Sequence, residues 1–185
     1  MTVSTQARRA DRVAAVLALL APRLGDDGER ARFEPFARDY FSQVDVDDLE
    51  ERTPDELAGA LWSHWRFGAV RSAGAPKVRV FNPAAADDGW PTGHSAVQIV
   101  NDDMPFLVDT VSMEIQRQGL TLHLIVHPIY AVERDDGGAL RTIAPRKALP
   151  QAPRESWMLV EVDRIADARQ QEALAAGIER ALGDV

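Results

Sequence analysis

The stretch VQIVNDDMPFLVDTV, residues 97–111, contains the change of periodicity that decides the fold. Residues 96–100 alternate with the period of two that is typical of a strand. Asn101, Asp102 and Asp103 then precede Met104-Pro105, an order that predicts a helix N-terminus with capping carboxylates and a proline in the first turn. The apolar face of the predicted helix is lined by Leu107, Val111 and Ile115. A strand followed directly by a helix is therefore expected here.

Working outward, the flanking residues supply the rest of a sheet. The expected elements are a strand at 78–81, a loop at 82–93, a β-rich run at 120–134, a turn at 136–138, a proline-rich loop at 144–153, a strand at 157–163 and a helix at 167–182. Gly119 is the expected left-handed stop of the central helix, and we expect it to tolerate a side chain less well than the hairpin glycine Gly138. This order predicts an α+β fold, with an antiparallel sheet and helices on one face.

The N-terminal third is helical in pattern. Thr53, Pro54 and Glu56 mark a helix start, and we expect that helix to run to about Arg71. Arginines before the apolar run 13–21 resemble a short secretory signal, but the run has helical spacing and no cleavage site follows it, which favours an amphipathic helix. We therefore divide the chain into an N-terminal helical segment, residues 1–75, and an α+β domain, residues 76–185.

Composition narrows the class of protein. Acidic residues outnumber basic ones by 29 to 21, giving a net charge of −8, and no basic patch stands out, so nucleic acid is not an expected partner. No apolar stretch is long enough to span a bilayer. Cysteine is absent, which rules out disulfides, thiolate metal sites and a cysteine nucleophile and is consistent with a cytoplasmic protein.

His123 and His127 have the spacing of a helical metal-binding pair, yet their surroundings indicate a strand. On a strand their Cα atoms are roughly 13 Å apart, too far for one zinc ion. We interpret them as polar members of a sheet face that also carries Ile125 and Ile129. That face is a candidate contact surface for another domain or subunit.

The acidic residues Asp102, Asp103 and Asp109 could bind a hard cation or perform acid–base chemistry, but capping a helix is the simpler interpretation. Ser156 has no nucleophile-elbow context, and no glycine pattern matches a dinucleotide fingerprint or a phosphate loop. We therefore predict no catalytic, cofactor-binding or metal-binding residues in this chain.

Residues 97–111 resemble the signature of the large NAD-specific glutamate dehydrogenases of bacteria. The resemblance continues through LHLIVHP (122–128), ESWM (155–158) and VEVD (160–163), and back to LWSHWRFG (61–68), KVRVFNP (77–83) and DGW (88–90). It covers most of the chain from about Phe36 onward and leaves the first thirty or so residues unplaced.

In that family the N-terminal part resembles ACT domains, βαββαβ modules that often sense amino acids or join subunits. By this resemblance, Asp103, Met104, Pro105 and Phe106 occupy the turn where amino-acid-binding ACT domains show aspartate, any residue, proline and glycine. Phe106 replaces the glycine, which argues against close approach of a ligand to this backbone. The closing ACT strand is absent or replaced, with Lys77–Phe81 as the candidate replacement.

Two functions follow from the resemblance. The first is an architectural or regulatory segment without catalysis, whose partners are the remaining domains and other subunits of an NAD-dependent glutamate dehydrogenase; pairing of the chain with itself is one form this could take. The alternative is a module that binds an amino-acid effector near Asp102–Phe106. The fragment itself is expected to hold no cofactor, with NAD binding elsewhere in the full-length enzyme.

Overall fold

The computed structural model describes residues 4–85 and 88–184, and one antiparallel sheet organises them. The strands are β1 (Lys77–Phe81), β2 (Ser95–Asp102), β3 (Leu122–Val126), β4 (Ile129–Arg134), β5 (Leu140–Pro145) and β6 (Arg154–Val162). They lie in the order β1-β2-β6-β4-β5, and β3 also pairs with β6. Since β3 pairs with the last residues of β6 and β4 with its first residues, β3 and β4 follow one another along the same edge of β6.

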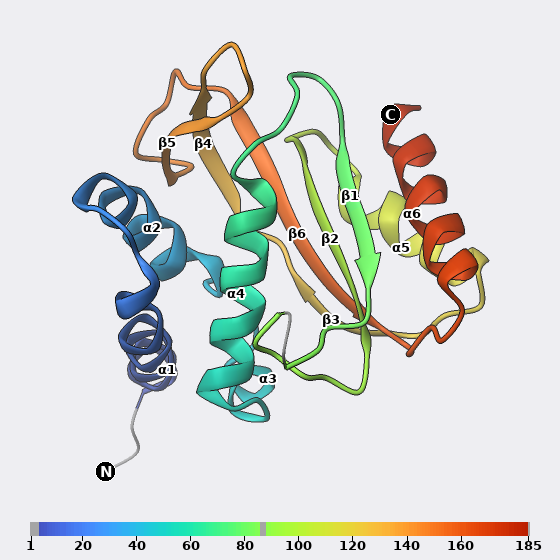
Figure 1. Cartoon of the computed structure of the whole chain (residues 1–185), viewed down its shortest axis with the longest axis horizontal. Helices are drawn as coiled ribbons and strands as arrows, with labels where there is room; N and C mark the ends of the chain where they lie inside the picture. Colours follow the sequence, from blue (N-terminus) through green and yellow to red (C-terminus); the bar gives the residue numbers. More distant parts are fainter. Residues whose placement is uncertain (1–3, 86–87, 185) are drawn as a thin grey trace.

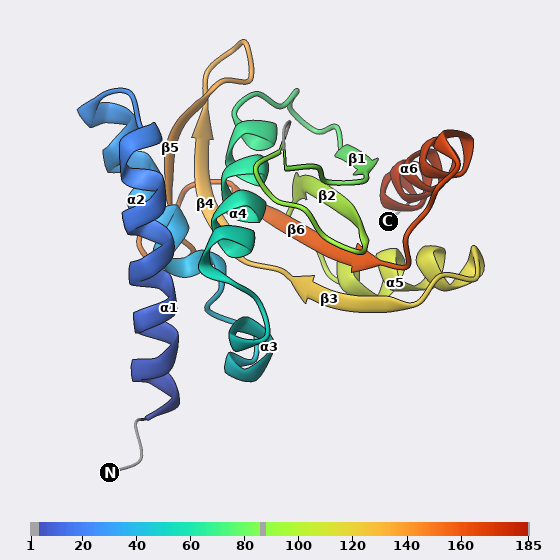
Figure 2. The same cartoon turned by 60° about the horizontal axis from the view of Figure 1, so that its bottom comes forward.

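Helices cover the sheet from both sides (Figures 1 and 2). The N-terminal helices are α1 (Thr5–Leu20), the short 3-10 helix η1 (Ala21–Arg23), α2 (Asp27–Tyr40), α3 (Val46–Glu50) and α4 (Pro54–Gly68). The other two helices are α5 (Leu107–Arg117) and α6 (Ala168–Gly183). In both views α1 to α4 gather at the β4-β5 side of the sheet, and α6 lies at the opposite, β1 side.

Two hydrophobic cores follow from this arrangement. The first lies between the N-terminal helices and one sheet face, and Phe36 is at its centre, with ring centroids 5.0 Å from Trp157 and 5.1 Å from both Trp65 and Tyr130. The second joins α5 and α6 to the opposite face through Val111, Ile115 and Ile178, among others. Because large aromatic side chains bury much apolar area, the first core fastens the helical segment firmly to the sheet.

The predicted fold class is confirmed. The α+β part has an antiparallel sheet with α5 and α6 on one face, and the N-terminal helical segment covers the other face. β1 pairs with β2 at the edge of the sheet. Residues 1–3, 86–87 and 185, which fall in the predicted segment, loop and domain, lie outside the described residues.

Several predicted boundaries were wrong. The β-rich run at 120–134 is two strands, because Pro128 has no N–H to donate to the ladder while its carbonyl oxygen accepts from the Trp157 amide at 3.0 Å. β5 begins between the predicted turn and the predicted loop, where no element was predicted, and extends into the loop; β6 begins at Arg154 rather than 157. Helix α4 ends at Gly68, three residues before the predicted end.

The predicted cap of the central helix was also wrong. The N-cap of α5 is Phe106, and no side chain caps the helix. Asp102 belongs to β2 instead, and the Asp103 amide donates to the Arg154 carbonyl oxygen at 2.9 Å, so the chain leaves the sheet only after these residues. Long-range pairing of the strand thus overrides the local capping preference of the two carboxylates.

Candidate functional site

The polar group with the most buried charge surrounds Arg71, in the loop after α4. Its guanidinium donates from Nη1 to Asp102 Oδ1 at 2.8 Å and to Glu155 Oε1 at 3.0 Å. Arg134 donates to both oxygens of the same Glu155 carboxylate, at 2.7 and 2.9 Å. The Arg71 and Glu155 side chains are only 2% and 5% exposed, whereas Asp102 is 53% exposed. Two cations and two anions therefore balance, with the charge of Asp102 at the surface.

This network joins parts of the chain that are distant in sequence. Arg71 follows α4, Asp102 ends β2, Glu155 begins β6 and Arg134 ends β4. Backbone bonds reinforce the junction, since the Arg71 amide donates to the Gly138 carbonyl oxygen at 3.0 Å and the Arg134 Nη2 donates to the Gly68 carbonyl oxygen. Removing one member of such a buried group leaves an uncompensated charge, so the network ties the helical segment to the sheet.

An open cavity of about 730 Å³ borders the network. Its wall includes Arg71, Gly74, Asp102 and the hairpin between β4 and β5, with Asp136 on that hairpin. Within the described part of the chain, Nη2 of Arg71 is buried and has no hydrogen-bond partner. A buried guanidinium N–H normally has an acceptor, so this donor is an exception. The half-exposed carboxylate of Asp102 lines the cavity.

Of the predicted effector turn, Asp102 to Phe106, only Asp102 lines this cavity. Phe106 has φ 67°, the left-handed conformation that normally requires glycine, and its residue surface is 72% exposed. The backbone therefore keeps the glycine-like shape expected at this turn, while the aromatic ring projects into solvent. Met104 is half-buried and packs against the second core, and Pro105 is exposed before the helix.

His127 lies between β3 and β4, near the same turn. Its Nε2 is 2.6 Å from the hydroxyl of Ser156. Burial lowers the pKa of the imidazole, and the nearby negative charge of Asp103 partly opposes that shift. A histidine bonded to a serine could suggest a nucleophile and its base, but Ser156 is only 1% exposed inside the sheet, so a substrate carbonyl has no access to it.

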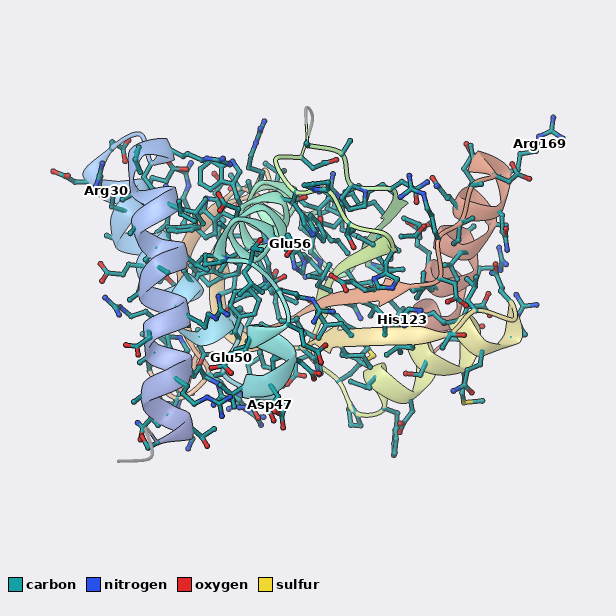
Figure 3. The ribbon with its side chains drawn as sticks, turned by 90° about the horizontal axis from the view of Figure 1, so that it is seen from below. Arg30, Asp47, Glu50, Glu56, His123 and Arg169 are labelled. Atoms are coloured by element: carbon teal, nitrogen blue, oxygen red, sulfur yellow. The ribbon has the colours of Figure 1, made fainter. Side chains whose placement is uncertain are left out.

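His123 belongs to a different cluster. Its ring stacks on His94, with centroids 4.2 Å apart, and its Nε2 is 2.8 Å from Asp163. This bond and the amide of Thr121 lower the pKa of the Asp163 carboxyl to about 2. In Figure 3, His123 lies on β3 between the helical segment that carries Glu50 and Glu56 and the C-terminal helix that carries Arg169. Among the described residues, no group of histidine and acidic side chains is arranged to hold a metal ion.

The structure therefore separates the predicted site residues into three places. Asp102 joins the Arg71 network, Asp103 lies near His127 beside the Met104–Phe106 turn, and His123 pairs with Asp163. Sequence reasoning missed Arg71, Arg134 and Glu155. A single arginine and a single glutamate carry no local signal, and only strand pairing brings them together.

An antiparallel sheet with two helices over one face, preceded by a helical segment on the other, defines an ACT-type α+β module. Residues 36–178 match the family model described as glutamate dehydrogenase, ACT1 domain. The chain belongs to this family.

Similar proteins agree with this assignment. The chain is 35% identical over 184 residues, 99% of its length, to the NAD-specific glutamate dehydrogenase of Halomonas elongata. It is also 35% identical over 186 residues to the enzyme of that name from Pseudomonas aeruginosa, and 32% identical over 128 residues to that of Mycobacterium tuberculosis. The chain spans only 11% of the length of the first two relatives. In the described residues, no helix is long and apolar enough to cross a membrane.

Proposed function

We propose that this chain is a non-catalytic architectural segment of an NAD-dependent glutamate dehydrogenase. The observation that carries the proposal is the Arg71–Asp102–Glu155–Arg134 network, which ties the helical segment to the sheet at four separate places in the chain. Together with the aromatic core around Phe36, it gives one block with fixed geometry. A block of this kind is suited to positioning other domains, because a shared core and a buried ion-pair network connect its parts.

The whole enzyme would convert L-glutamate and NAD to 2-oxoglutarate, ammonium and NADH. The names of the relatives support NAD as its cofactor. We assign binding of that cofactor to domains outside these residues, because the sequence has no dinucleotide fingerprint. The partners of this chain would be those domains and the other subunits, in the cytoplasm.

The test is an activity measurement on the pure 185-residue chain. With glutamate and NAD we expect no formation of NADH above a mock preparation, and no change in tryptophan fluorescence on adding NADH. Turnover by the pure chain would overturn the non-catalytic assignment, and saturable NADH binding would overturn the assignment of the cofactor to other domains.

A second function, amino-acid sensing near Asp102–Phe106, is favoured by one observation. The cavity is lined by the cationic Arg71 and by Asp102, whose carboxylate is half-exposed. A zwitterionic amino acid carries a carboxylate for the first group and an ammonium for the second. Binding should raise the melting temperature of the chain by mass action, and Asp102→Asn should reduce that rise. A panel of the common amino acids that leaves the melting temperature unchanged would remove this function.

A further inference from the structure

The conformation of Phe106 is not offset by burial of its side chain within this fold. A side chain in the left-handed region costs about 1–2 kcal/mol relative to glycine, and this ring is 72% exposed, so little burial offsets the cost. Backbone strain that the local fold does not explain is often found at sites that bind a ligand or a partner. Phe106 is therefore a candidate anchor for a partner.

The side of α5 that follows Phe106 has matching character. Met113 lies seven residues later, two turns along the same side, and is 69% exposed. Asp109 is exposed in the first turn of the helix. We call Phe106, Asp109 and Met113 the α5 knob: two apolar side chains with a carboxylate between them.

A groove complementary to this knob lies on the same molecule. Its volume is about 730 Å³, and its apolar lining residues are Ile125, Pro128, Ile129 and Pro145. Arg146 and Lys147, both exposed, form a basic rim, and the other lining residues are Asp39, Ser42, Gln43 and His127. Two cations against the single carboxylate of Asp39 leave the lining net basic, which suits an apolar group flanked by a carboxylate. We call this feature the β3-β4 groove.

The knob and the groove lie close together. Ser156 connects them: it pairs with Asn101 of β2, a few residues before Phe106, and its hydroxyl is 2.6 Å from Nε2 of His127, which lines the groove. When a projection and its complementary hollow are neighbours on one surface, two copies related by a twofold axis can exchange them reciprocally. Such a contact closes on itself, because each knob fills the groove of the other copy.

We propose that the α5 knob of one chain inserts into the β3-β4 groove of a second copy of the same chain. The pairing would bury Phe106 against Ile125 and Ile129, with Asp109 facing the basic rim. Aromatic anchors in apolar pockets commonly dominate the energy of an interface. This inference is independent of the proposed function, since an architectural segment could also act as a monomer.

The experiment compares sedimentation of the 185-residue chain with that of Phe106→Gly and of the control Leu19→Ala. Leu19 is also exposed, at 41%, but lies on α1. We expect the unchanged chain and the control to form dimers. Phe106→Gly should weaken self-association by roughly thirtyfold or more, while its melting temperature stays the same or rises, because glycine removes the left-handed strain. This opposite effect on pairing and stability separates loss of an anchor from loss of the fold.

A monomeric unchanged chain, or a Phe106→Gly dimer as tight as the original, would overturn the proposal. A charge exchange then tests the orientation. Lys147→Glu should weaken the dimer and the added Asp109→Lys should restore part of the loss, since the two side chains would face each other across the interface. If the second substitution weakens the dimer further, the proposed pairing of knob and groove is wrong.

Discussion

Replacing Gly138 by alanine should destabilise the chain more than the same change at Gly119. Both glycines have positive φ, 80° and 74°, so each alanine carries the same left-handed cost of about 1–2 kcal/mol. Their surroundings differ. A Cβ on Gly138 would lie 2.2 Å from the carbonyl oxygen of Arg71, whereas a Cβ on Gly119 would meet nothing within 4 Å.

The contact at Gly138 is with backbone, which cannot turn aside as a side chain can. It also lies at the junction where the Arg71 amide donates to the Gly138 carbonyl oxygen. Overpacking typically adds about 1–3 kcal/mol, so we expect a total of roughly 2–5 kcal/mol at Gly138 and about 1–2 at Gly119. This reverses the order expected from the sequence, which treated Gly138 as part of an adjustable hairpin tip.

Urea unfolding of the two variants gives the comparison directly, and Gly74→Ala is the matched control. Gly74 has φ 69° and open space around it, so its variant should resemble Gly119→Ala. In thermal unfolding, each kcal/mol should lower the melting temperature by about 2–4 °C for a chain of this size. Equal losses at Gly138 and Gly119 would refute the reasoning, because they would mean that the hairpin relaxes away from Arg71 at no cost.

Two further predictions concern buried charge and pH. Glu155→Gln should destabilise the chain by about 3–5 kcal/mol, because it leaves Arg71 and Arg134 without their shared carboxylate. Asp102→Asn changes a half-exposed position and should destabilise the chain much less. Chemical denaturation of both variants would test this difference. Burial lowers the pKa of His64 to about 3 from 6.5, so the unfolded chain binds a proton between these pH values that the folded chain does not. The free energy of unfolding should therefore fall as the pH falls below 6.5, by up to about 1.4 kcal/mol per pH unit from this group. If the free energy of unfolding of His64→Gln depends on pH in the same way over this range, His64 is not the source of the dependence.

The candidate site was only partly accessible from the sequence. The turn at Asp102–Phe106 was recognisable because its residues are consecutive and match a family signature. The left-handed φ of Phe106 was not predicted, because the sequence shows only that a phenylalanine stands where the family's pattern has glycine. The network around Asp102 could not be predicted, since Arg71 is 31 residues from Asp102 and 84 residues from Glu155 in the chain. The two histidines likewise share a sequence motif but not a location, because His123 on β3 stacks on His94 while His127, just after β3, contacts Ser156.

The sequence by itself determined the class of the fold and the strand–helix unit around residues 97–111. Both can be predicted from the periodicity of apolar residues and from turn-forming residues, which are patterns among a few neighbouring positions. Only the tertiary structure decided that the helical segment covers the second face of the sheet, that Arg71 and Glu155 form a buried ion pair, and that Gly138 touches Arg71. Each of these depends on pairing between strands and helices distant in the chain, and a local pattern contains no information about which distant surface will bury it.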